Sequence, residues 1–96
     1  MSQGQNTLCP EDRLLALVGV LGEDEASGMR QLETLLSNYP GDPRLHFLKG
    51  SVLAGNQDYV AARDVMRRAV DLAPDYPIAR FQLGFLLLTC GEPHAS

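Results

Sequence analysis

The chain has 96 residues, enough for one domain with a modest hydrophobic core. Its apolar fraction of 45% and charged fraction of 21% are ordinary for a folded soluble protein. The net charge of −4 argues against a nucleic-acid-binding protein, because such proteins concentrate basic side chains on one face.

The N-terminal segment and the cysteines indicate the cellular compartment of the chain. Residues 1–8 are polar and lack periodicity, so we expect a flexible tail, and acidic residues follow where a signal peptide would be hydrophobic. No apolar run is long enough to cross a bilayer, so we expect no membrane association. Two cysteines, Cys9 and Cys90, are too few for a disulfide scaffold. We therefore expect free thiols and a reducing, cytoplasmic location.

The first half of the chain predicts two helices. Pro10 followed by two acidic residues is a helix-start composition, and apolar residues with helical spacing continue until Gly22. A second helix begins with acidic residues near 23–25. It carries one apolar face and ends at Pro40.

Three more helices follow. Asp42 is a good N-cap for a third helix, which runs to the pair Gly55-Asn56, a left-handed C-cap. Asp58 can cap a fourth helix, and Pro77 opens a fifth that ends near Cys90. The fourth helix has a predicted inward face made of Tyr59, Ala62, Val65, Met66, Ala69 and Leu72. With short connections and no strand candidate, the sequence predicts an all-α stack of antiparallel helical hairpins.

Residues recur at a spacing of 34. The pairs are Pro40 and Pro74, Pro43 and Pro77, Phe47 and Phe81, and Gly50 and Gly84. A fixed period of this size indicates stacked supersecondary units. Glycine within a helix costs about 1 kcal/mol relative to alanine, so we expect a neighbouring helix to pack against the bare backbone at Gly50 and Gly84.

Residues 43–76 resemble a tetratricopeptide repeat. With Pro43 at position 1, the family's small residues and proline correspond to Gly50, Ala62, Ala69 and Pro74. A degenerate unit precedes this repeat at 9–42 and a truncated one follows at 77–96. The resemblance implies one domain over residues 9–96, with five helices stacked as a short right-handed α-solenoid.

The resemblance also implies a ligand groove lined by the first helix of each unit. The expected partner-binding residues are Arg13, Leu17, Arg44, Phe47, Ser51, Phe81, Phe85 and Leu88, with a place in the core as the equal alternative for Leu17 and Phe47. One subclass of the family grips a C-terminal carboxylate through asparagines at position 9 of the repeat. Leu17 and Ser51 stand there in this chain, so we reject that function. A mostly apolar groove suits an amphipathic helix or an extended apolar peptide.

The fifth helix is apolar around nearly its whole circumference, although no later helix follows in the chain. A terminal repeat normally needs a polar outer face. Three explanations stay open: a fragment whose next helix is missing, self-association as a dimer, or a partner helix that completes the stack. The predicted self-association residues are Ile78, Phe85, Leu86 and Leu88.

No catalytic set is recognisable. The serines lack a nucleophile motif, and no glycine-rich phosphate loop is present. Cys90 and His94 have no second pair to complete a metal site. Arg63, Arg67 and Arg68 alternate with acids, which favours ion pairing on a solvated face.

We therefore expect a non-enzymatic, cofactor-free and metal-free module that binds a protein or peptide, without nucleic acid or membrane. The alternatives are a docking arm cut from a larger regulatory or enzymatic protein, or a secretion-type chaperone.

Overall fold

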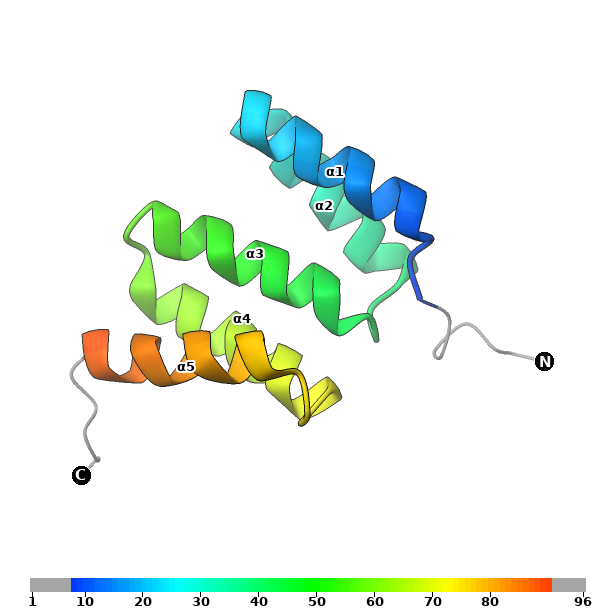
Figure 1. Cartoon of the computed structure of the whole chain (residues 1–96). Helices are drawn as coiled ribbons and strands as arrows, with labels where there is room; N and C mark the ends of the chain where they lie inside the picture. Colours follow the sequence, from blue (N-terminus) through cyan, green and yellow to red (C-terminus); the bar gives the residue numbers. More distant parts are fainter. Residues whose placement is uncertain (1–7, 91–96) are drawn as a thin grey trace.

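A computed structural model describes residues 8–90, and these residues form five helices without a strand (Figure 1). The helices are α1 (Glu11–Glu23), α2 (Glu25–Asn38), α3 (Pro43–Gly55), α4 (Tyr59–Leu72) and α5 (Pro77–Thr89). The all-α prediction and the number of helices are confirmed for this part of the chain. Residues 1–7 of the predicted tail, and Gly91 and Pro93 beyond the fifth helix, lie outside the described residues.

Prolines and aspartates fix several helix ends as predicted. Pro43 and Pro77 occupy the first positions of α3 and α5, where the missing N–H removes no helical hydrogen bond. Asp42 caps α3 by accepting a hydrogen bond from the backbone N–H of Arg44. Asp24 caps α2 in the same way through the N–H of Ser27.

The ends of three helices differ in detail from the sequence prediction. α1 continues through Gly22 to Glu23, since a glycine within a helix weakens it without stopping it. The Asp58 side chain makes no capping hydrogen bond to α4. The left-handed residue after α3 is Gln57, with φ of 67°, because Gly55 stays helical and Asn56 keeps a negative φ.

Each helix packs against the next one in the sequence, and two clusters of buried side chains hold the helices together. The first joins α1, α2 and α3 through Cys9, Leu17, Leu32, Leu35 and Leu45. The second joins α4 and α5 through Ala62, Met66, Ala69, Ala79 and Leu86, and the partly buried Phe47, Leu53 and Ala54 of α3 pack against it. Because α3 contributes to both clusters, it is the central element of the molecule.

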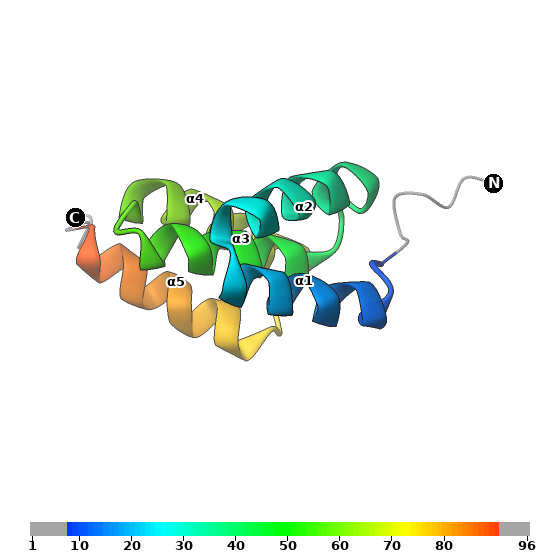
Figure 2. The same cartoon turned by 90° about the horizontal axis from the view of Figure 1, so that it is seen from above.

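The helices form a flat body of 43 × 34 × 19 Å. Figure 2 shows α1 and α5 on one side, α2 and α4 on the other, and α3 between them. The inward face predicted for α4 is largely correct, since Ala62, Met66 and Ala69 are fully buried. Leu72 is the exception: it is the last residue of the helix and it is exposed.

The two glycines of the repeat differ in their surroundings. A Cβ added at Gly50 would lie 2.7 Å from Met66 Cε and 3.4 Å from the carbonyl oxygen of Ala62, so α4 packs against bare backbone there as predicted. At Gly84 nothing lies within 4 Å of an added Cβ, so no described residue covers that position and this half of the prediction is wrong. No helix within residues 8–90 is both long and apolar enough to cross a bilayer.

Candidate interaction surfaces

Asp42 ties the segment before α1 to the turn that precedes α3. Its buried carboxylate accepts a hydrogen bond of 2.8 Å from the backbone N–H of Cys9. It also accepts hydrogen bonds of 3.0 and 2.8 Å from Nε and Nη2 of Arg44. Nη2 of Arg44 also donates to the carbonyl oxygen of Cys9 at 2.7 Å. We call these three residues the Cys9–Asp42–Arg44 clasp. It joins residues more than thirty positions apart and holds the Arg44 guanidinium in one orientation.

The clasp sets the ionisation of its members. Burial raises the pKa of Asp42, but the hydrogen bonds from Arg44 and from the Cys9 N–H outweigh it and leave the pKa below the ordinary value. For the Cys9 thiol, burial and then the nearby Asp42 carboxylate raise the pKa. The clasp therefore holds a carboxylate charged and a thiol protonated at neutral pH.

A hollow of about 140 Å³ lies where α1 faces α3 and the turn before α5. Apolar side chains make most of its wall, and Leu15 and Val18 from α1 are exposed. Phe47 of α3 packs against Tyr76 with ring centroids 5.6 Å apart. The residues of this α1–α3 groove are Leu14, Leu15, Val18, Arg44, Phe47, Leu48 and Tyr76. Because the clasp holds Arg44, the groove presents hydrocarbon and little free charge.

A second apolar surface covers the side of α5 turned away from α4. Ile78, Phe81, Phe85 and Leu88 are 51%, 75%, 53% and 78% exposed. Phe81, Phe85 and Leu88 line a shallow hollow of about 370 Å³ together with Gly84 and Arg80. We call Ile78, Phe81, Gly84, Phe85 and Leu88 the α5 face. Exposed apolar side chains concentrated in this way mark interaction sites in soluble proteins.

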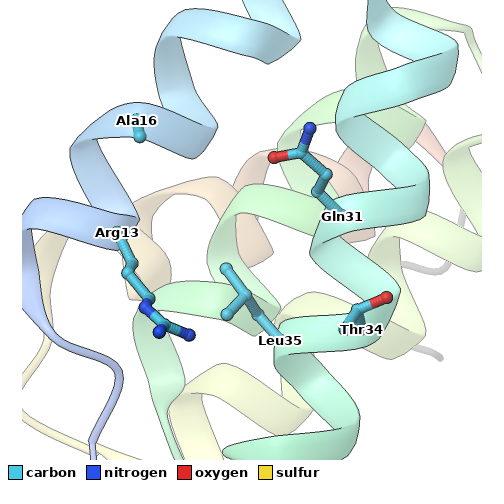
Figure 3. A pocket seen from close by; sticks show the side chains of 5 residues that line it. All are labelled: Arg13, Ala16, Gln31, Thr34 and Leu35. Atoms are coloured by element: carbon cyan, nitrogen blue, oxygen red, sulfur yellow. The ribbon is translucent and has the colours of Figure 1, made fainter.

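A third hollow, of about 280 Å³, lies between α1 and α2. Figure 3 shows Arg13 and Ala16 on one wall and Gln31 and Thr34 on the other, with Leu35 between them. Here α1 and α2 stand in front of the rest of the chain, so this is the N-terminal end of the stack. Most of the surface that lines this hollow is apolar, although Arg13, Gln31 and Thr34 each carry a polar group.

The structure places two predicted site residues in the core. Leu17 is 1% exposed and belongs to the first buried cluster, so its assignment to the partner-binding groove is wrong. Leu86 is fully buried against α4, so its assignment to the self-association surface is also wrong. Ile78, Phe85 and Leu88, the other residues predicted to self-associate, are exposed together on the α5 face.

The remaining groove residues divide among the surfaces. Arg44 and Phe47 line the α1–α3 groove, whereas Phe81, Phe85 and Leu88 line the separate hollow on α5. Arg13 lines the third hollow, and the half-buried Ser51 lines none of the three, so the structure brings neither residue into the α1–α3 groove.

Sequence reasoning missed the α1 side of the groove, which is made by Leu14, Leu15 and Val18. α2 and α4 start 34 residues apart, at 25 and 59, but α1 and α3 start 32 apart, at 11 and 43. The connection after α1 is the single residue Asp24, whereas residues 56–58 connect α3 to α4. A strict period of 34 therefore rotates the assignments on α1, because each residue turns a helix by about 100°. The short connection was the signal that could have corrected them.

Some charged side chains at the surface form ordinary ion pairs. Arg63 contacts Asp64 at 3.1 Å, which accounts for one of the three arginines expected to form ion pairs, and Lys49 contacts Glu33 at 2.8 Å. His46 Nε2 lies 2.9 Å from the carbonyl oxygen of Pro40 and is satisfied there.

Both cysteines are free thiols, Cys9 buried and Cys90 half-buried. His94, which the sequence analysis considered together with Cys90 as a possible metal ligand, lies outside the described residues. Within residues 8–90 no group of three or more histidine, cysteine, aspartate or glutamate side chains is placed to hold a metal ion. Comparison with family models, curated proteins and solved structures found no match to this chain.

Proposed function

We propose that this chain is a non-catalytic, tetratricopeptide-like module that binds another polypeptide. In this proposal the helical hairpins stack as a short right-handed solenoid, and the α1–α3 groove and the α5 face are its binding surfaces. The observation that carries it is the exposure of large apolar side chains on α1 and α5, the two helices on one side of the molecule (Figure 2). Such an arrangement offers a partner hydrocarbon on both flanks of α3.

The energy available from these side chains is sufficient for recognition. Burial of one large apolar side chain contributes roughly 1.5–3 kcal/mol. Leu15, Val18 and Phe81 are exposed in the free chain, so a partner that covers them gains several times that amount before the cost of ordering is subtracted.

The clasp indicates the chemistry of the ligand. The Arg44 guanidinium already donates to Asp42 and to the Cys9 carbonyl oxygen, so it is a poor anchor for a ligand carboxylate. The groove therefore favours an apolar peptide face, as an amphipathic helix or an extended segment presents, over a charged chain end.

A random peptide library displayed on phage tests the proposal. The chain should enrich peptides with apolar residues at helical or alternating spacing. Leu15→Asp should abolish their binding, because it places a charge at the groove. Val60→Asp is the control, since Val60 is a similarly exposed apolar residue on α4. Enrichment of no sequence, or equal binding to both variants, would refute the assignment of the groove.

The two free thiols support a reducing compartment, and we propose the cytoplasm as the site of action. Alkylation of the chain in intact cells, followed by mass spectrometry of both cysteines, measures this directly. A disulfide recovered at either cysteine would contradict it.

A further inference from the structure

Comparison of α3 with α5 shows that the α5 face is more apolar than repetition requires. Thirty-four residues separate Ser51 from Phe85 and Ala54 from Leu88, so small residues on α3 correspond to large apolar ones on α5. Gly50 is covered by α4, whereas nothing covers Gly84. The α5 face thus combines large side chains with one bare position between them.

The segments that flank the described residues do not have the composition to cover the α5 face. Residues 1–7 and 91–96 are mainly glycine and polar residues, and Met1 is the one large apolar side chain among them. Burial of four large side chains requires apolar partners of similar size. Neither segment therefore offers an apolar surface that matches the α5 face.

The opposite end of the stack carries a charged side chain at its hollow, whereas the α5 face is apolar. Arg13, Gln31 and Thr34 surround the hollow at that end (Figure 3). A head-to-tail contact would take the Arg13 guanidinium out of water without supplying an acceptor, which is costly. Contact between the α1–α2 end of one copy and the α5 face of another is thus disfavoured. Contact between the α5 faces of two copies avoids this cost.

We propose that a second copy of this chain covers the α5 face, with the two α5 helices antiparallel and crossing near Gly84. This deepens the proposed function in one respect, since it names the partner of one of the two surfaces. A two-fold axis near Gly84 lets Phe81 and Phe85 of each copy pack beside the bare backbone of the other. The same patch then serves both copies, as an isologous interface requires.

Charge favours the antiparallel orientation. Arg80 is the one charged side chain within α5. A parallel pair would bring the two Arg80 side chains together. The antiparallel pair brings each Arg80 near Leu88, in the last turn of the other α5, where the partial negative charge of the helix end stabilises a cation.

The exposed area agrees with a weak, concentration-dependent dimer. From their exposed fractions, Ile78, Phe81, Phe85 and Leu88 together present roughly 500 Å² of side-chain surface per copy. Two copies would bury about 1,000 Å² from these side chains, which is near the lower limit for a specific interface.

Sedimentation velocity across a wide range of concentrations tests the proposal. We expect a shift from monomer to dimer, and Phe81→Asp should weaken dimerisation by roughly 30-fold or more, because it buries an unpaired charge at the centre of the contact. Val60→Asp is the matched control and should leave the dimer unchanged. Circular dichroism of each variant verifies that its helices form. A chain that stays monomeric at every concentration refutes the proposal and leaves the α5 face to a different polypeptide. A dimer that Phe81→Asp does not weaken also refutes the proposal.

Cross-linking tests the geometry. In a Cys90→Ser background, Gly84→Cys should form a covalent dimer on mild oxidation much faster than Gly19→Cys, whose position on α1 is equally open. Equal rates would refute an axis near Gly84. Leu15→Asp separates this inference from the proposed function, because it should abolish peptide binding while the dimer persists. If Leu15→Asp abolished both peptide binding and dimerisation, the assignment of two separate surfaces would be overturned.

Discussion

Replacement of Asp42 tests whether the clasp holds the N-terminal segment to the rest of the fold. Asp42→Ala removes the cap of α3, the ion pair with Arg44 and the acceptor of the buried Cys9 N–H. Loss of an N-cap costs about 1 kcal/mol, and an unsatisfied buried donor adds about 1–3 kcal/mol. Arg44 keeps partial access to solvent, which limits the cost of leaving it unpaired. We therefore expect the free energy of unfolding to fall by about 2–4 kcal/mol.

Urea unfolding followed by circular dichroism measures this loss, with Asp24→Ala as the matched control. Asp24 also caps a helix through a backbone N–H, but it lies at the surface and bonds only within its own turn. The control variant should lose clearly less stability than Asp42→Ala. If the two substitutions have equal effects, Asp42 is an ordinary cap and the clasp adds nothing.

The pH dependence gives a second readout of the clasp. The pKa of Asp42 is lower in the folded state than in the unfolded state, so its stabilisation is complete above the unfolded pKa of about 4. It is lost as the pH falls through the lower, folded pKa. The wild-type chain should therefore lose more stability in acid than Asp42→Ala does. Parallel stability curves for the two proteins between neutral and acid pH would contradict this.

Further predictions concern packing and reactivity. Gly19→Ala should raise stability by about 0.5–1 kcal/mol, because an added methyl group meets nothing. Gly28→Ala should lower it by about 1–3 kcal/mol, because the methyl would lie 2.8 Å from Leu21 Cα. Leu86→Ala should lower the free energy of unfolding by about 2–5 kcal/mol, because Leu86 is fully buried. Leu88→Ala should lower it by under about 0.5 kcal/mol in the monomer, because Leu88 is mostly exposed. Urea unfolding measures all four variants. Alkylation timed by mass spectrometry should modify Cys90 before the buried Cys9, whose pKa is raised by burial, and the reverse order would contradict the burial of Cys9.

The sequence predicted the helices well because their ends depend on local chemistry. Pro43 and Pro77 start helices by their own covalent geometry, and Asp24 and Asp42 cap helices through side chains that reach only two or three residues along the chain. Such signals can be recognised without knowledge of the tertiary structure. The five helices follow from them.

The site residues were harder to predict because exposure depends on how helices rotate against each other. Leu86 and Leu88 are both leucines near the end of an apolar helix, yet one is fully buried and the other mostly exposed. Only the position of α4 separates them. On α1, the side chains that line the groove are Leu14, Leu15 and Val18, and Arg13 and Leu17 lie elsewhere. A hydrophobic pattern that covers a whole helix contains no information about which side faces the core.

Gly50 and Gly84 separate what the local sequence determines from what the neighbours determine. Both are helical glycines at the same point of the 34-residue unit, and both carry the intrinsic cost of glycine in a helix. At Gly50 the cost is offset, because Met66 and the backbone of Ala62 pack closely against the bare position. At Gly84 no described residue supplies that contact, so the cost is uncompensated in the isolated chain. A helix that approaches Gly84 from another molecule would remove this difference, and the dimer therefore predicts slower amide hydrogen exchange around Gly84 at high than at low protein concentration.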